Sequence, residues 1–330
     1  MDASFRRTTP IYLQALKPDL LMGKRAALSK SITLIESKRI DDQSLAGNLI
    51  DQILDKTGNS IRIGITGVPG VGKSSFIEQF GSYLTSLGKK VAVLTIDPSS
   101  NRTKGSILGD KTRMEKLSKN EHAFVRPSAS GSSLGGVASN TRESILLCEA
   151  AGYDVIIVET VGVGQSETAV KEMVDYFLLL MLAGGGDELQ GIKRGIMEMA
   201  DHILINKADG DNLIKAKRAA KEYQNAIHLF PPNDSAWIVP VGTCSALENR
   251  GLEDVWREIQ KFTESTHENG WFARNRSAQT INWFHERVKN HLLTSFHQNS
   301  DMKAKMKKKE ELISSQKLSV RKAVLELFNS

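Results

Sequence analysis

The sequence predicts a three-layer α/β sandwich with a largely parallel central sheet, preceded and followed by helical segments. Two observations lead to this fold class. Short β-branched apolar runs alternate with amphipathic helical stretches between Ile61 and about Gly251, and this alternation is typical of a parallel sheet covered on both faces. The chain before and after this region lacks strand-like alternation. It is therefore expected to be helical at both ends.

The segments follow this plan in order. Leu45, Leu49 and Ile53 recur at the spacing of one helical face within residues 11–58, which predicts an N-terminal helical extension over residues 1–58. The central domain is predicted at 59–265 and a C-terminal helical arm at 266–330. The predicted strands are 61–66, 91–96, 154–159, 176–182, 202–206 and 236–241.

Composition narrows the class of protein. The 330 residues carry a formal net charge of +6, and much of the excess lies in the lysine cluster of 303–309, so a nucleic-acid partner is not predicted. Cys148 and Cys244 are the two cysteines, which excludes a disulfide framework. The sequence shows neither a secretory signal nor an apolar run long enough to cross a bilayer. We therefore predict a cytoplasmic protein without a membrane partner.

A phosphate-binding loop is predicted at residues 67–74. The segment GVPGVGKS fits the pattern GxxxxGK[ST] and lies between a predicted strand and a predicted helix. The glycines allow backbone N–H groups to turn towards phosphate oxygens. Lys73 would reach the β- and γ-phosphates, and the Ser74 hydroxyl would ligate Mg²⁺.

A guanine-binding site is predicted at Asn206, Lys207 and Asp209. These residues form NKAD directly after the apolar strand HILI. An aspartate carboxylate can accept hydrogen bonds from N1–H and the exocyclic amine of guanine, whereas adenine offers neither donor there. Ser245, followed by Ala246 and Leu247, resembles the last guanine-contacting loop of GTPases.

Acidic residues at the ends of strands point to a metal site. Asp97 follows one predicted strand and Glu159 ends another, so both are expected at the carboxyl edge of the sheet beside the phosphate loop. With Asp110 in the following polar loop, they would anchor Mg²⁺ or its waters. The alternative for Asp97 and Asp110 is a helix-capping or turn role.

The segment ETVG resembles a DxxG switch element with Glu in place of Asp. Gly162 could donate its N–H to the γ-phosphate, and Gln165 is a candidate for orienting water. Arg102 and Arg113 are candidates for neutralising phosphate charge, and the sequence does not choose between them.

These motifs closely resemble the methylmalonyl-CoA mutase-associated GTPases, also labelled MeaB, ArgK-type or lysine/arginine/ornithine transport ATPases. This family shares a P-loop class with the signal-recognition-particle and nickel-insertion GTPases. The segments that carry the resemblance are GVPGVGKSS, LTIDPSS, GSILGDKTRM, VIIVETVGVGQSE, GDELQGIKRGIMEMAD and INKADGDN.

The resemblance implies a Mg²⁺-dependent, GTP-hydrolysing chaperone. It would gate cofactor loading and protect or reactivate an adenosylcobalamin-dependent acyl-CoA mutase. It also implies a homodimer formed through the C-terminal helices. Asp187, Gln190 and Lys193 would belong to a switch loop that couples nucleotide state to the mutase.

The predicted site residues fall into two overlapping sets. The catalytic and metal-binding set is Lys73, Ser74, Asp97, Asp110 and Glu159. The nucleotide-binding set is Gly67, Val68, Pro69, Gly70, Val71, Gly72, Lys73, Ser74, Ser75, Gly162, Asn206, Lys207, Asp209, Ser245, Ala246 and Leu247.

Three alternatives remain at this point. A metallochaperone GTPase for nickel or cobalt insertion would share the core fold, although such proteins usually carry clustered Cys or His, and the seven histidines here are scattered. A kinase or transport ATPase is disfavoured by NKAD. An interaction module with an inactive nucleotide site is disfavoured by Lys73 and Ser74.

Overall fold

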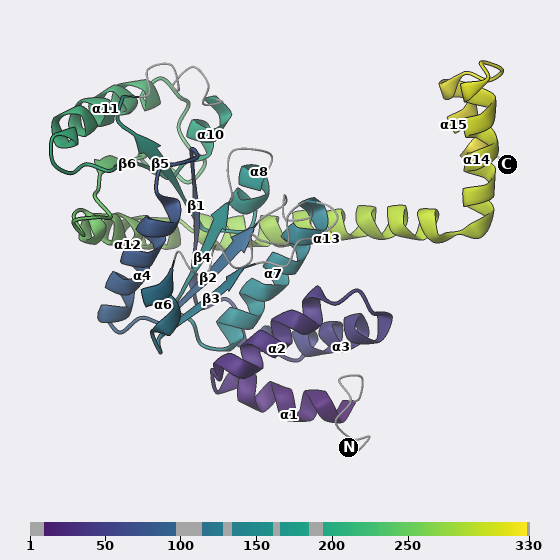
Figure 1. The fold of residues 1–330 in the computed structure, drawn as a ribbon, viewed down its shortest axis with the longest axis horizontal. Helices are drawn as coiled ribbons and strands as arrows, with labels where there is room; N and C mark the ends of the chain where they lie inside the picture. Colours follow the sequence, from purple (N-terminus) through teal and green to yellow (C-terminus); the bar gives the residue numbers. More distant parts are fainter. Residues whose placement is uncertain (1–9, 97–113, 128–133, 161–165, 185–193, 329–330) are drawn as a thin grey trace. The chain divides into compact units, whose positions relative to one another are not determined.

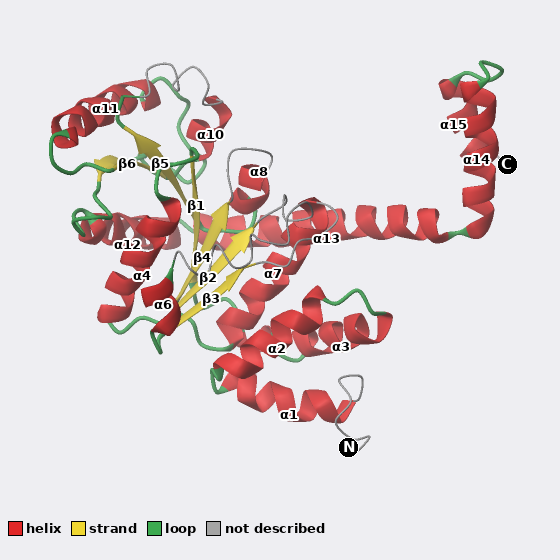
Figure 2. Ribbon diagram, in the orientation of Figure 1, coloured by secondary structure: helices red, strands yellow, loops and turns green. Residues whose placement is uncertain are grey.

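A parallel seven-stranded sheet forms the centre of the protein, with strand order β3-β2-β4-β1-β5-β6-β7 (Figures 1 and 2). The computed structural model describes residues 10–96, 114–127, 134–160, 166–184 and 194–328. The strands are β1 (Ile61–Gly67), β2 (Val91–Ile96), β3 (Ala123–Pro127), β4 (Val155–Thr160), β5 (Tyr176–Leu182), β6 (His202–Asn206) and β7 (Val241–Thr243).

Helices cover both faces of this sheet. One face of the sheet carries Phe177, and its side chains pack in two apolar clusters with a first group of helices. This group includes the three N-terminal helices. On the other face, Leu178 and the residues on its side pack against a second group. The first group is α1 (Pro10–Leu21), α2 (Arg25–Glu36), α3 (Ile40–Asp51), α7 (Leu134–Ala150), α8 (Ser166–Lys171), α10 (Arg194–Met199) and α11 (Asn212–Ile227). The second group is α4 (Lys73–Ser86), α6 (Glu115–Lys119) and α12 (Leu252–Glu268).

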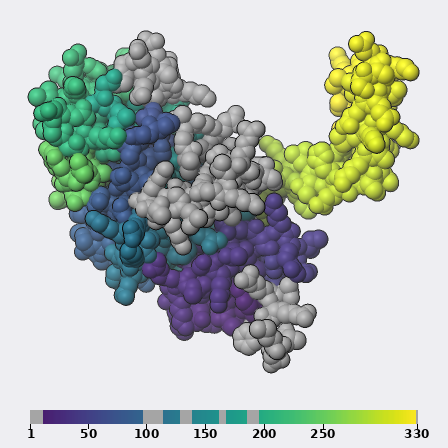
Figure 3. Space-filling view, in the orientation of Figure 1, coloured from purple at the N-terminus to yellow at the C-terminus, as the bar shows by residue number. Residues whose placement is uncertain are grey.

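The N-terminal helices confirm the prediction of a helical extension. Leu49 and Ile53 are fully buried, and α2 packs against α7 and against its neighbours α1 and α3. In Figure 3 these helices lie in purple against the body of the first unit. Their apolar faces thus extend the core on one side of the sheet.

One predicted strand is wrong and one strand was not predicted. Residues 236–240 do not form a strand, because Ala236 adopts a left-handed backbone with φ 57° and Pro240 has no N–H to donate. β7 begins afterwards, at Val241. β3 pairs with β2 alone at the sheet edge. Its five residues end in Arg126 and Pro127, which hide it from a search for apolar runs.

The described chain divides into two compact units, Met1–Ser277 and Ala278–Ser330. The predicted boundaries at 58 and 265 stay a prediction. Helix α13 (Trp271–Gln298) runs across the boundary between the units, and α14 (Ser300–Ser314) and α15 (Val320–Phe328) follow it. None of the helices in the described part of the chain combines the length and apolarity that a membrane crossing requires.

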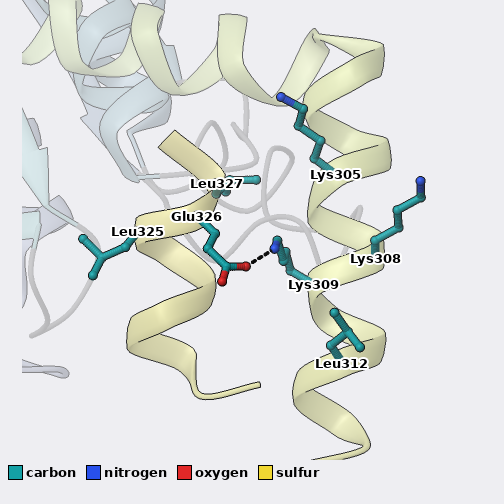
Figure 4. Close-up of a pocket in the computed structure, with 7 residues that line it drawn as sticks. All are labelled: Lys305, Lys308, Lys309, Leu312, Leu325, Glu326 and Leu327. Carbon is teal, nitrogen blue, oxygen red and sulfur yellow. Dashed lines mark hydrogen bonds and ion pairs between the residues drawn. The ribbon is translucent and has the colours of Figure 1, made fainter. Parts of the chain in front are cut away.

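The second unit ends in a helical hairpin of α14 and α15. The Asn299 side chain caps α14 by accepting from the N–H groups of Asp301 and Met302, at 2.9 and 3.1 Å. Lys309 forms an ion pair with Glu326 across the hairpin, and Figure 4 shows this pair between the two helices. Lys309 and Glu326 also line a pocket of the hairpin. The other residues that line this pocket are Lys305, Lys308, Leu312, Leu325 and Leu327.

Buried charges hold the first turns of α13 to the amino edge of the sheet. The Arg276 guanidinium donates to both carboxylate oxygens of Asp175, each at 2.7 Å. It also donates to the carbonyls of Gly58 and Ser60, at 2.7 and 2.6 Å. Asp175 is 1% exposed, so its charge depends on this fork of donors.

A second buried pair lies beside the first. Arg62 in β1 donates to both oxygens of Glu149 in α7, at 2.9 and 3.0 Å. The Glu149 carboxylate also accepts from the Ser60 hydroxyl at 2.8 Å and from the Gly58 N–H at 2.9 Å. The chain that enters β1 is therefore fixed by the same charges that fix α7.

We expect Arg276→Ala to lower the free energy of unfolding by about 3 kcal/mol, because it leaves the buried Asp175 charge without its main partner. Urea unfolding followed by circular dichroism measures this change. The control is Arg274→Ala in the same helix, since Arg274 is exposed. An equal effect of the two substitutions would contradict the assignment of the anchor to Arg276.

Candidate functional site

The predicted phosphate loop joins the end of β1 to the start of α4. A Cβ atom at Gly67 would lie 2.4 Å from the carbonyl oxygen of Leu180 in the neighbouring β5, so this position accepts no side chain. Gly72, directly before α4, has φ 92°, a conformation that favours glycine. The loop thus turns sharply into a helix whose N-terminus favours negative charge.

Lys73 lies folded over this loop. Its ammonium donates to the carbonyl of Gly67 at 2.7 Å and to that of Val68 at 3.4 Å. Burial lowers the pKa of Lys73, while the charges of Glu159 and Glu167 act in the opposite direction. A phosphate group in the loop would add negative charge and so favour the protonated lysine.

A hydroxyl and a carboxylate meet beside the loop. The Ser74 hydroxyl, in the first turn of α4, donates to Glu159 at 3.2 Å. Glu159 lies in β4, one residue before its end, and is 4% exposed. Hydroxyl and carboxylate oxygens are the hard donors that Mg²⁺ prefers, so the pair fits the ion predicted from the sequence.

The predicted base site lies at the end of β6. Asp209 accepts a hydrogen bond of 2.7 Å from the Ser245 hydroxyl, which joins two of the motifs that sequence analysis proposed. Lys207 turns the chain with φ 58°. The structure therefore brings the NKAD segment and the 245–247 segment together.

The 245–250 loop is closed by its own backbone. Ser245 and Arg250 exchange two backbone hydrogen bonds of 3.0 Å, and the Glu248 N–H donates to the Ser245 hydroxyl at 3.0 Å. Ala246 is buried and Leu247 is 84% exposed. These contacts fix the hydroxyl that orients Asp209.

The phosphate and base segments are in direct contact. The Asn206 side-chain amide donates to the backbone carbonyl of Val71 in the phosphate loop at 2.8 Å. Asn206 is 1% exposed, and a Cβ atom at Gly72 would lie 3.0 Å from its amide nitrogen. The two predicted halves of the site thus lie at the same carboxyl edge of the sheet.

Two residues at this edge, Glu167 and Cys244, were not predicted from the sequence. Glu167 in α8 is 1% exposed and acts electrostatically on Lys73. Cys244 donates its thiol to Asn206 at 3.2 Å. Glu167 could have been found as an acidic residue in the first turn of a helix after the switch segment. No sequence signal marks Cys244.

Several predicted residues lie outside the described residues. These are Asp97, Asp110, Gly162, Asp187, Gln190 and Lys193, together with the candidates Arg102, Arg113 and Gln165. Within the described ranges, no three His, Cys, Asp or Glu side chains come close enough together to hold a metal ion.

The parallel sheet, the loop between β1 and α4 and the NKAD turn define a P-loop nucleotide-binding protein. Comparison with known proteins narrows this class. Residues 28–301 match the family described as methylmalonyl Co-A mutase-associated GTPase MeaB. The chain belongs to this family.

Individual relatives agree with the family assignment. The chain is 53% identical to a putative GTPase of Caulobacter vibrioides, over 86% of this chain and 87% of the relative. It is 49% identical to the GTPase ArgK of Escherichia coli, over 86% and 85%. The predicted family and GTPase class are thereby confirmed.

A solved structure confirms the fold class. The crystal structure of an LAO/AO transport system kinase superposes with a TM-score of 0.77 and 39% identity, covering 97% of each chain. The N-terminal helices, parallel sheet and C-terminal helical region predicted from the sequence are therefore those of a known architecture.

Proposed function

We propose that this chain hydrolyses GTP with Mg²⁺ at the site described above and acts as a G-protein chaperone of an adenosylcobalamin-dependent acyl-CoA mutase. The observation that carries the GTP site is the hydrogen bond from Asn206 to Val71. It holds a base-reading segment against a phosphate loop, so that one nucleotide can engage both.

The phosphates would bind along residues 67–75. Backbone N–H groups of this loop and the N-terminus of α4 attract phosphate oxygens, and Lys73 would leave the Gly67 carbonyl to bind the β- and γ-phosphates. Ser74 and Glu159, with Asp97 and Asp110, would hold Mg²⁺. The ion neutralises phosphate charge when it is bound.

The purine would bind at Asp209. Its carboxylate accepts from N1–H and the exocyclic amine of guanine, and adenine would leave the carboxylate without these donors. Ser245 donates to one oxygen of Asp209 and so limits its rotation. Lys207, Ala246 and Leu247 would complete the base-binding surface.

We expect Asp209→Asn to shift the preference from guanine to xanthine nucleotides, because the amide can donate to the xanthine C2 oxygen. Titration with GTP and XTP, followed by calorimetry, should show at least a tenfold change in the ratio of affinities, about 1.4 kcal/mol.

The matched control is Asp211→Asn, because Asp211 is an exposed carboxylate two residues further along. It should bind as the wild-type protein does. If the Asp209 variant kept the wild-type ratio for the two nucleotides, the base site would be assigned to the wrong residue.

The mutase partner is supported by the description of the family, which names an association with methylmalonyl Co-A mutase. We propose that GTP hydrolysis gates cofactor loading and protects or reactivates the mutase. Asp187, Gln190 and Lys193 would couple the two proteins, because they follow β5 in the sequence and β5 ends at the edge of the sheet where we propose that the nucleotide binds.

We expect Lys193→Ala to leave the basal GTPase rate within about twofold of wild type and to reduce stimulation by the mutase by at least tenfold. Phosphate release with and without purified adenosylcobalamin-dependent mutase measures both rates. Stimulation of the variant equal to that of wild type would reject the coupling role.

We also propose a homodimer formed through the second unit. Ile281, Phe284, Val288 and Leu292 recur on one face of α13, and each is at least 40% exposed. An apolar helix face of this length is typical of an interface.

Phe284→Glu with Leu292→Glu should convert the dimer into a monomer, because charges on this face cannot be buried without partners. Light scattering reads the mass. The exposed Asn290→Glu on the same helix serves as the control. A wild-type protein with the mass of one chain would contradict the dimer.

A further inference from the structure

Cys244 lies against the turn that carries the base-reading residues. Its N–H donates to the carbonyl of Ile205 at 2.9 Å, and its own carbonyl accepts from the N–H of Ala208 at 2.9 Å. These two bonds bracket Asn206 and Lys207. The backbone of Cys244 is therefore fixed to both ends of the NKAD turn.

The side chain of Cys244 continues this arrangement. Its thiol donates to the Oδ1 atom of Asn206 at 3.2 Å, while the Nδ2 atom of Asn206 donates to Val71 at 2.8 Å. Burial raises the pKa of the Cys244 thiol, and the charge of Asp209 raises it further. The sulfur therefore keeps its proton and serves as a donor.

These contacts determine the orientation of the Asn206 amide. If the amide rotated by half a turn, Oδ1 would face the carbonyl oxygen of Val71 and neither would have a donor. With the thiol in place, both ends of the amide are satisfied in a residue that is 1% exposed. A chain of hydrogen bonds thus runs from the 243–245 segment to the phosphate loop.

We propose that Cys244 is a positioning residue, whose thiol fixes the Asn206 amide and thereby holds the base-reading turn against the phosphate loop. This inference rests on the proposed nucleotide site. Its expected consequence is slow release of bound nucleotide, because the ligand would contact both segments and the thiol fixes their relative position.

The preference for guanine is expected to depend on a different contact, the one between Ser245 and Asp209. Asp209 is held by the Ser245 hydroxyl at 2.7 Å, which does not involve the thiol. Loss of the thiol donor is therefore expected to weaken the binding of GTP and of ITP, which lacks the exocyclic amine, by the same factor. The ratio between the two affinities stays as in wild type.

The test compares Cys244→Val with Cys244→Thr. The Val and Thr side chains have nearly the same shape, but only Thr carries a hydroxyl that can donate to Asn206. The release rate of fluorescently labelled GDP is measured by displacement with unlabelled GDP. The Val variant is expected to release it about three to ten times faster than wild type, as the loss of one hydrogen bond implies. The Thr variant is expected within twofold of wild type, with association rates unchanged in both.

Cys148→Ala is the matched control, because Cys148 is a buried cysteine in α7. It is expected to lower the thermal midpoint without changing the release rate. If the larger side chains prevent folding, Cys244→Ala and Cys244→Ser provide the same comparison with smaller ones.

Equal release rates for the variants with and without a hydroxyl would overturn the positioning role, whether both match wild type or both exceed it. A wild-type protein that binds neither GDP nor GTP would instead contradict the proposed function. The two failures are therefore distinguishable in one set of measurements.

Discussion

The contact between Asn206 and Val71 is the constraint on which the site depends. β1 and β6 are separated by β5 in the sheet, and parallel pairing brings their carboxyl ends to one edge. The hydrogen bond of 2.8 Å from the Asn206 amide to the Val71 carbonyl then sets the distance between the NKAD turn and the phosphate loop. A bound nucleotide must fit this separation.

The opposite edge of the sheet serves stability. Arg62, Glu149, Asp175 and Arg276 are paired there in a buried cluster, which ties β1, α7, the start of β5 and the first turns of α13 together. Charged residues thus occur at both edges with different consequences. At the amino edge they satisfy one another. At the carboxyl edge the Lys73 ammonium donates to backbone carbonyls, which the phosphates of the proposed ligand would replace.

Much of the fold could be predicted from the pattern of apolar residues, because buried parallel strands are continuous apolar runs in the sequence. The strand at 202–206 was predicted with its bounds. The strand predicted at 236–241 was wrong, since the left-handed Ala236 leaves no trace in hydrophobicity. β3 was missed because an edge strand tolerates Arg126 and Pro127.

Residues of the candidate site could be predicted where a motif has a fixed spacing. They could not be predicted where contacts join distant segments. The motifs GVPGVGKS and NKAD identify candidate residues by sequence alone. The family match agrees with the class of protein that these motifs indicate. The bond from Cys244 to Asn206 joins positions 38 residues apart. No sequence motif marks a thiol that donates to this asparagine, so the contact could be found only in the structure.

A crystal structure of the protein with a non-hydrolysable GTP analogue and Mg²⁺ would show directly whether one nucleotide contacts both segments. We expect the phosphates along residues 67–75 and the guanine edge within hydrogen-bond distance of the Asp209 carboxylate. Density that placed the purine away from Asp209 would contradict it.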